Sequence, residues 1–400
     1  MITKIKFRRT VSAPPAEVYR AFTNVTALRE WLCDAAQADP RKGGRLYLWW
    51  NSGYYTSGEY VAVLPGKKIA FTWRGRGEPD ATRVQISLAE KNGGTAVTLT
   101  HAGIGSGIKW AGVAKEFQSD WESKLENLQS VLETGQDLRI VRRPLLGVSL
   151  GEFNAEMAAK LGVPVAEGAR LDDVLEGRGA RAAGLRKDDV IVRLGGKKVI
   201  NWATFTSAVQ PHRAGDQVAV VFYRGAEKKT VTLELSRRPL PDTPPTAQAF
   251  AEAARKMYAG FDAELAACLE GVSEVEALHQ PAPGEWSVKE TLAHLVVNER
   301  ELHAWITDLI VGDERCSDAN PTSVPARLAA VTAVFSTLPA LAEELECHEA
   351  ETVAMLAALP PEFMAHQGSY WRLAHIILQA PDHFQTHTGQ IRAAVAAARK

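Results

Sequence analysis

The chain has 400 residues, of which 46% are hydrophobic and 23% are charged, and its formal net charge is −1. This composition is typical of a globular protein, and the length predicts two or three domains rather than one core. No apolar run reaches about 18 residues, so no membrane span is predicted. The first residues lack the apolar segment of a signal peptide, so a cytoplasmic location is expected.

Charge is distributed unevenly along the chain. Residues 1–140 and 141–245 each carry a net charge of +5, whereas residues 246–400 carry −11. The acidic character of the last segment argues against nucleic-acid binding. The change in charge coincides with the proline-rich stretch 237–245, which predicts a semi-rigid linker. The expected domains are residues 1–138, 143–237 and 246–400.

The four cysteines are scattered and form no C-x-x-C pair. This spacing argues against a disulfide framework and against a zinc site built from thiolates. The cysteines are Cys33, Cys268, Cys316 and Cys347.

The first segment predicts an α+β grip. A strand through Ile5 and Phe7 is followed by a short helix opening at Pro14. Short alternating runs separated by glycine-rich turns predict a meander of antiparallel strands. Apolar residues at helical spacing then predict a long last helix that ends at Gly135.

Several short motifs of this segment carry a family resemblance: Val11-x-Ala13-Pro14, Leu28-x-x-Trp31, Phe71-Thr72-Trp73 and Asp120-Trp121. In this order they resemble the START-like (SRPBCC) superfamily, in the branch related to the heat-shock chaperone ATPase activator. The resemblance implies a cavity between sheet and long helix that takes a small apolar ligand. Trp49 and Trp73 are candidates for its lining, and the alternative is that they only pack the core.

The middle segment resembles a mainly-β PDZ domain of the bacterial HtrA type. The motifs are Gly147-Val148, Ala183-Gly184-Leu185, Asp189-Val190-Ile191-Val192 and a hairpin turning at Arg224-Gly225. The sequence departs from the family at Arg178-Gly179 and at Asp188.

The PDZ resemblance implies that the domain captures the C-terminus of a peptide or protein as an added strand. Its carboxylate loop falls on Leu145, Leu146, Gly147 and Val148. Phe205 and Val209, on the helix predicted over 201–210, are candidates for the groove wall, and the alternative is that both belong to the core. Since no Gly-x-Ser-x-Gly motif or comparable triad accompanies this domain, protease activity is not expected.

The last segment predicts an all-α four-helix bundle. Helices are expected from Thr246, from a capping box of Ser287 with Glu290, over 327–359, and over 371–398 with a kink at Pro381. His383 and His387 are four residues apart, so both imidazoles lie on one helix face. His294, on the second helix, offers a third imidazole, and three neutral histidines with an open position form a catalytic type of zinc site.

These motifs resemble the DinB family of four-helix proteins. The resemblance places a zinc or nickel ion on His294, His383 and His387 and implies thiol transfer as a family activity. Gln390, on the same helix face, is a candidate partner behind the ligands. The alternative is three unrelated histidines. The remaining histidines of the bundle, His279, His303, His348, His366 and His375, are expected in surface or core positions.

Two functions remain open from the sequence. The first is a multidomain binding protein with an apolar-ligand cavity, a peptide groove and a metal site. The second is a metal-dependent thiol transferase or hydrolase that uses the bundle. Metal affinity is expected to fall as the pH drops through about 6.5, the ordinary pKa of histidine.

Overall fold

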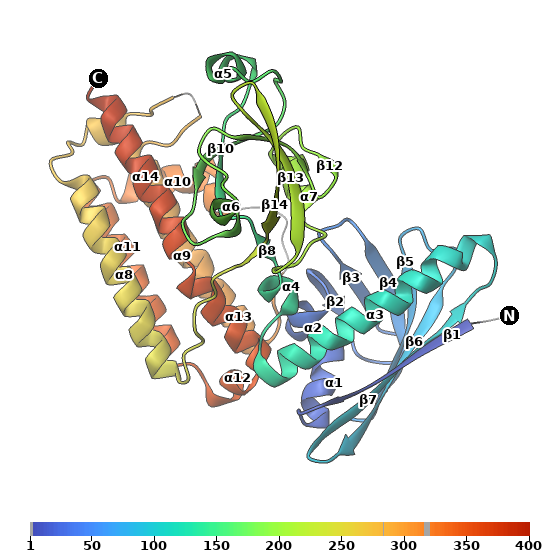
Figure 1. The fold of residues 1–400 in the computed structure, drawn as a ribbon. Coiled ribbons are helices and arrows are strands. Elements are labelled where there is room, and N and C mark those ends of the chain that lie inside the picture. Colours follow the sequence, from blue (N-terminus) through green and yellow to red (C-terminus); the bar gives the residue numbers. More distant parts are fainter. Residues whose placement is uncertain (1–2, 283, 316–320) are drawn as a thin grey trace. The chain divides into compact units, whose positions relative to one another are not determined.

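The computed structural model describes residues 3–282, 284–315 and 321–400 (Figure 1). These residues form two compact units, one that joins residues 1–137 with 241–400 and one of residues 138–240. Regions at opposite ends of the sequence therefore fold as one body. Among the described residues, no single helix is long and apolar enough to cross a membrane, although α10 (Pro325–Val334) and α11 (Leu338–Ala357), bent by 109°, pass that test as a pair.

The N-terminal part is a seven-stranded antiparallel sheet with the order β1-β7-β6-β5-β4-β3-β2. The long helix α3 runs across one face of this sheet (Figure 1), and its apolar residues share one core with the strands. Gly135 ends α3 in the left-handed conformation with φ of 77°. The elements are β1 (Thr3–Val11), α1 (Pro15–Thr23), α2 (Val25–Trp31), β2 (Ala35–Ala38), β3 (Arg45–Trp49), β4 (Tyr55–Leu64), β5 (Lys68–Gly75), β6 (Thr82–Lys91), β7 (Gly94–Ile104) and α3 (Ile108–Thr134).

The middle unit is built around a sheet with the order β14-β13-β11-β10-β9, in which β12 pairs with β11, and β15 pairs with β8 apart from it. The hairpin of β13 and β14 pairs Val220 with Val231. Its elements are α4 (Leu138–Val141), β8 (Pro144–Leu145), β9 (Val148–Gly151), α5 (Ala155–Leu161), β10 (Ala169–Val174), α6 (Gly179–Ala182), β11 (Val190–Leu194), β12 (Lys197–Lys198), α7 (Trp202–Val209), β13 (Gln217–Arg224), β14 (Glu227–Glu234) and β15 (Ser236–Arg237).

The C-terminal part is helical. Two of the four helices expected from the sequence are divided. The third ends at Val334 and restarts at Leu338, where Thr337 caps the new helix and accepts from the N–H of Ala340. The fourth breaks before Pro381, which begins the last helix. The elements are α8 (Ala247–Leu269), η1 (Glu276–Leu278), α9 (Val288–Val311), η2 (Pro321–Ser323), α10 (Pro325–Val334), α11 (Leu338–Ala357), α12 (Pro361–Ala365), α13 (Gln367–Leu378) and α14 (Pro381–Ala398).

These elements confirm the predicted fold class: an α+β grip, then a β-rich middle region, then an all-α region. Local chemistry explains why the segments begin and end where they do. Ser287 and Glu290 form the predicted capping box at the start of α9. Each side chain accepts a hydrogen bond from the backbone N–H of the other residue.

Candidate functional site

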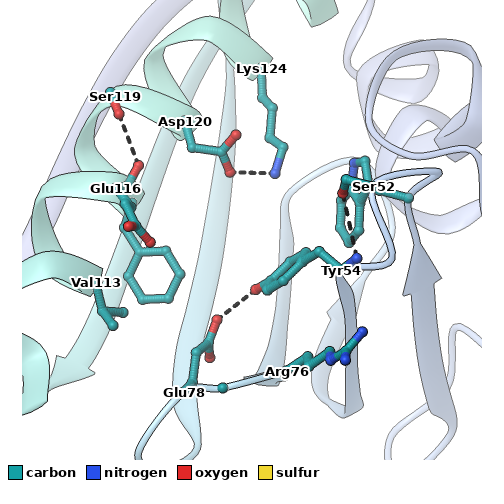
Figure 2. Close-up of a pocket in the computed structure, with 12 residues that line it drawn as sticks. Ser52, Tyr54, Arg76, Glu78, Val113, Glu116, Ser119, Asp120 and Lys124 are labelled. Carbon is teal, nitrogen blue, oxygen red and sulfur yellow. Dashed lines mark hydrogen bonds and ion pairs between the residues drawn. The ribbon is translucent and has the colours of Figure 1, made fainter. Parts of the chain in front are cut away.

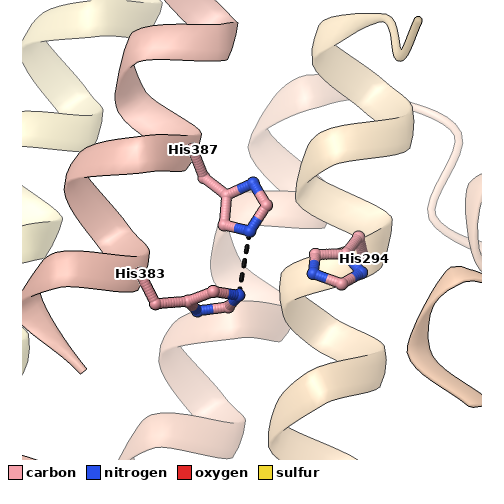
Figure 3. A group of neighbouring side chains, drawn as sticks. All are labelled: His294, His383 and His387. Carbon is pink, nitrogen blue, oxygen red and sulfur yellow. Dashed lines mark hydrogen bonds between the residues drawn. The ribbon is translucent and has the colours of Figure 1, made fainter. Parts of the chain in front are cut away.

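Three histidines converge between α9 and α14 (Figure 3). His383 and His387 lie one turn apart on α14, and His294 faces them from α9. One ring nitrogen from each lies within 4.8 Å of the others. His294 and His387 are each 5% exposed. The structure therefore brings together the three residues that the sequence singled out.

Hydrogen bonds fix which ring nitrogen of two of these histidines is free. His294 Nδ1 lies 2.9 Å from the carbonyl oxygen of Thr322, and His387 Nδ1 lies 2.8 Å from Gln390 Oε1. Both oxygens accept, so each Nδ1 carries the proton and each Nε2 keeps its lone pair. A metal-binding histidine is usually held in this way, with its other nitrogen donating to a carbonyl oxygen.

The distance between the Nε2 atoms of His383 and His387 also suits a shared ion. His387 Nε2 lies 2.9 Å from His383 Nε2. Two nitrogens bound at about 2.0–2.1 Å to one zinc ion would lie about 3.3 Å apart at a tetrahedral angle. If the two rings move slightly apart, a divalent ion can therefore bind between them. The three nitrogen donors fit zinc or nickel.

Burial keeps this cluster neutral. It is the main reason that the pKa of each histidine lies below its ordinary value, and for His383, which also faces His387 and His294, the pKa falls to about 4. Neutral imidazole is the form that binds metal. Competition by protons should therefore begin at a lower pH than the value of about 6.5 expected from the sequence.

A cavity of about 430 Å³ lies beside the cluster, and His383 is one of its lining residues. Tyr258, Glu299 and Trp305 also line it. Glu299 accepts hydrogen bonds from Tyr258 (3.1 Å) and from Thr352 (2.8 Å), and burial raises its pKa. The lining of the cavity thus includes both a carboxyl group that can transfer a proton and an imidazole of the cluster.

A second buried acid lies in the same helical region. Glu349, on α11, is 2% exposed, and its carboxyl group interacts with that of Asp262. Burial raises its pKa to about 10, and the negative charges of Asp262, Glu299 and Glu346 act in the same direction. Glu349 is therefore protonated at neutral pH.

This proton predicts a pH-dependent stability. Between about pH 4.5 and pH 10, unfolding releases the proton of Glu349. The contribution of this residue to the free energy of unfolding is therefore complete below pH 4.5 and declines as the pH rises. Glu349→Gln stays neutral throughout. It should raise the melting temperature by on the order of 5 °C at pH 8 and hardly at all at pH 4.5. Thermal unfolding at both values tests this, with the exposed Glu343→Gln on the same helix as control. An equal effect at both pH values would contradict it.

The N-terminal part has a cavity of about 520 Å³ (Figure 2). Its lining combines Trp50 and Phe117 with charged groups. Lys124 pairs with Asp120 and lies 4.5 Å above the Trp50 ring, and Tyr54 donates to Glu78 over 2.6 Å. The cavity is therefore aromatic and charged rather than purely apolar.

The two tryptophans predicted to line this cavity are not among its lining residues. Trp73 is 2% exposed and lies behind the lining, where its Nε1 donates to Glu78 over 3.0 Å. Trp49 lies at the end of β3, and its neighbour in sequence, Trp50, reaches the cavity. Alternation along the chain points adjacent side chains in different directions, which explains the shift by one residue.

The predicted carboxylate loop lies between β8 and β9. Leu146 is buried, and the carbonyl groups of Leu146 and Gly147 accept from Ala180 (3.1 Å) and Leu175 (2.9 Å). Within the described residues, neither the Leu146 N–H nor the Gly147 N–H donates a hydrogen bond. Gly147 has φ of 79°, which favours glycine.

The two predicted groove-wall residues differ in burial. Phe205 is 9% exposed and belongs to the core of the middle unit, whereas Val209 is half-buried against it. Leu175, beside the loop, is 43% exposed and offers apolar surface there. A separate cavity of about 440 Å³ in this unit is lined by none of the six residues predicted to bind peptide.

Sequence reasoning missed Tyr258, Glu299 and Thr322. Glu299 follows His294 by five residues, so helical spacing alone does not place it on the face of His294. Thr322 contributes only its backbone, which no side-chain pattern reveals. His303, His348 and Glu351 form another cluster of ligand atoms within 4.8 Å of one another. The spacing His348-x-x-Glu351 was the sequence signal that could have indicated this cluster, because residues three apart on a helix lie on the same face.

Family models match all three regions. Residues 12–133 match the activator of Hsp90 ATPase homolog 1-like protein family, residues 144–235 match the PDZ domain, and residues 257–391 match the DinB superfamily. The three resemblances stated from the sequence are thereby confirmed, in the same order.

Curated relatives are bacterial proteins named as proteases. A probable periplasmic serine protease do/HhoA-like of Haemophilus influenzae is 33% identical over 125 residues, 31% of this chain and 26% of that protein. The periplasmic serine endoprotease DegP of Escherichia coli K12 is 32% identical over 114 residues, 28% of this chain and 23% of DegP. The chain thus spans about a quarter of the length of these relatives.

Solved structures similar to the chain include an HSP90 activator from Plasmodium falciparum, 26% identical, covering 32% of this chain and 95% of that one with a TM-score of 0.29. The Aha1 dimer from Colwellia psychrerythraea is 21% identical, covering 33% and 96% with a TM-score of 0.29. By the family-model matches alone, the chain carries in sequence a region similar to the activator of Hsp90 ATPase homolog 1-like family, a region similar to the PDZ domain and a region similar to the DinB superfamily.

Proposed function

We propose that the DinB region is a metal-dependent site at which a small thiol or water reacts with a substrate held in the neighbouring cavity. The ion, zinc or nickel, would be held by His294, His383 and His387. The observation that carries the proposal is the double role of His383, which belongs to the histidine cluster and also lines the cavity with Glu299. A bound ion would lower the pKa of a thiol or water in its open position.

The residues of the chain have distinct roles in this proposal. Gln390 and the Thr322 carbonyl orient two imidazoles so that both present Nε2. Glu299 exchanges a proton with the nucleophile or leaving group, since burial raises its pKa above the ordinary value. Tyr258 and Thr352 hold the Glu299 carboxyl group in place. Trp305 and Phe384 supply apolar lining that excludes water.

The test uses the full chain loaded with zinc or nickel and mixed with small thiols and electrophilic or ester substrates. Thiol consumption or hydrolysis should depend on the metal. Glu299→Gln should lower the rate by on the order of 100-fold and flatten its pH profile, while metal content stays unchanged. Glu343→Gln, at an exposed position of α11 outside the cavity lining, is the control. If the loaded chain turns over neither class of substrate, the site is structural and the proposal fails.

We also propose that the PDZ domain binds peptides with a free C-terminal carboxylate. The N–H groups of Leu146 and Gly147, which donate no hydrogen bond within the described part of the chain, and the exposed Leu175 support this. The absence of protease activity stays a prediction, and the names of the curated relatives describe those proteins.

Amidating the peptide should weaken this binding at least about 10-fold, because hydrogen bonds to a charged acceptor are the strong ones. Titration of the chain with matched peptides that end in valine, free and amidated, measures the difference. Gly147→Ala should also weaken binding of the free peptide, since an added Cβ would lie 2.2 Å from Arg178 Cβ. Equal affinity for both peptides would show that the loop is not a carboxylate site.

For the START-like region, we propose a small ligand with an aromatic or apolar body and a polar end, or a chaperone partner. The combination of Trp50 and Phe117 with Lys124 and Glu78 in the cavity lining supports such a ligand. A cytoplasmic location remains a prediction of the sequence.

A further inference from the structure

A second cluster of ligand atoms lies between α9 and α11. His303 comes from α9, and His348 and Glu351 lie three residues apart on α11. The Nδ1 atoms of both histidines lie 3.7 Å from the same oxygen, Glu351 Oε2. The nearest ring nitrogens and this oxygen all lie within 4.8 Å of one another.

The hydrogen bonds of His303 direct a lone pair into this cluster. His303 Nε2 lies 3.1 Å from the carbonyl oxygen of His348 and 2.9 Å from Thr352 Oγ1. The carbonyl can only accept, and the Thr352 hydroxyl already donates to Glu299. Nε2 therefore carries the proton, and in the neutral ring Nδ1 keeps its lone pair facing the Glu351 carboxylate. A metal ion or a proton between these two electron-rich atoms would remove their repulsion.

His348 also places its Nδ1 beside Glu351, at 3.7 Å from Oε2. Arg300 Nε donates to its Nε2 over 3.0 Å, and Glu344 Oε1 lies 3.0 Å from the same nitrogen. In the neutral ring the proton is on Nδ1 when Nε2 accepts from Arg300, and on Nε2 when Nε2 donates to Glu344. Its Nδ1 is buried and has no hydrogen-bond partner among the described residues. The side chains of His303 and His348 are 14% and 17% exposed, whereas that of Glu351 is 60% exposed. An ion can thus enter from the Glu351 side and meet Nδ1 of both histidines, with the proton of His348 on Nε2, where it donates to Glu344.

We infer that His303, His348 and Glu351 form a second site for a divalent transition-metal ion such as zinc or nickel. Two imidazole nitrogens and one carboxylate oxygen are a donor set for such ions, and solvent completes the coordination. This site is separate from the histidine cluster of His294. His303 follows His294 by nine residues on α9, which places it about 13 Å along the axis and on the opposite face. The inference therefore does not depend on the proposed function.

The test measures metal content of the full chain after removal of metal by a chelator, dialysis against zinc and removal of free zinc. The chain should hold two equivalents, and Glu351→Gln or His348→Ala should hold one. His383→Ala should also hold one, and combining it with Glu351→Gln should leave none. Two controls should keep both zinc equivalents. Glu343→Gln changes an exposed glutamate on the same helix, and Cys347→Ser removes a neighbouring exposed thiol.

A spectroscopic measurement separates metal binding from a simple ion pair of protonated histidine with Glu351. In ¹⁵N spectra of the imidazoles at pH 7.5, zinc should shift Nδ1 of His303 and His348 while Nε2 of His303 stays protonated. The exposed Glu351→Gln change should abolish this shift without altering the circular dichroism spectrum. If Glu351→Gln retains as much zinc as the parent chain, or if the parent holds one equivalent that His383→Ala removes, the inference is overturned.

Discussion

Replacing His383 with alanine should remove the ion from the cluster of His294, His383 and His387 and lower metal content by one equivalent per chain. Each of the three histidines supplies one ring nitrogen. Once His383 is replaced, the other two histidines offer an ion only two protein ligands. His294→Ala and His387→Ala should have the same effect. Gln390→Ala should keep the ion but weaken its binding by about 10- to 100-fold, because His387 loses the partner of its Nδ1.

Thermal unfolding provides a second measurement of this prediction. The cluster joins α9 to α14, so a bound ion stabilises the helical region by mass action. The gain is about 2.7 kcal/mol when free metal is 100 times the dissociation constant. A chelator should reverse it in Glu351→Gln, which keeps this cluster, and have no such effect when Glu351→Gln is combined with His383→Ala.

The choice of control depends on the structure. His375 lines the cavity and stacks on Trp371 with ring centroids 4.9 Å apart, and His366 pairs with Glu17. Replacing either histidine would therefore disturb other contacts. His279 is exposed, and His279→Ala should leave metal content and metal-dependent stability unchanged. Full occupancy of the cluster after loss of any one of its histidines would contradict the shared site.

Replacing Glu314 with alanine should destabilise the unit formed by residues 1–137 and 241–400 by about 3–5 kcal/mol. Glu314 is 4% exposed and pairs with Arg29 over 2.8 Å and with Arg372. It also accepts from Trp305 Nε1 over 2.8 Å. Its removal leaves two partly buried guanidinium groups without their shared carboxylate, and such a loss is a large part of the stability of an ordinary domain.

Denaturant unfolding of the full chain measures this effect. The matched control is Glu252→Ala, which removes the partner of Arg255 from an exposed ion pair and should change stability little. Glu314→Gln keeps an acceptor for Trp305 but not the charge, so its stability should lie between those of the parent and of Glu314→Ala. If Glu314→Ala and Glu252→Ala are equally stable, the buried ion pairs do not hold the two ends of the sequence together.

The sequence by itself determined the local features of this protein. The capping box of Ser287 and Glu290 and the glycine at 135 set helix ends through chemistry confined to a few residues. Thr337 and Pro339 likewise mark the start of α11, so the break in the third helix was also present in local signals. Family motifs identified the three regions in order. Helical spacing placed His383 and His387 on one face.

Only the tertiary structure decided which distant groups meet. Glu299 reaches the cavity of His383, and His303 meets His348 across 45 residues of sequence, because α9 packs beside α11 and α14. Glu314 meets Arg29 although 285 positions separate them in numbering. Periodicity describes the direction of a side chain from its own helix and not the helix that lies opposite. The order of the regions and the local ends of helices could therefore be predicted, whereas the partners of buried charges and of histidine nitrogens could not.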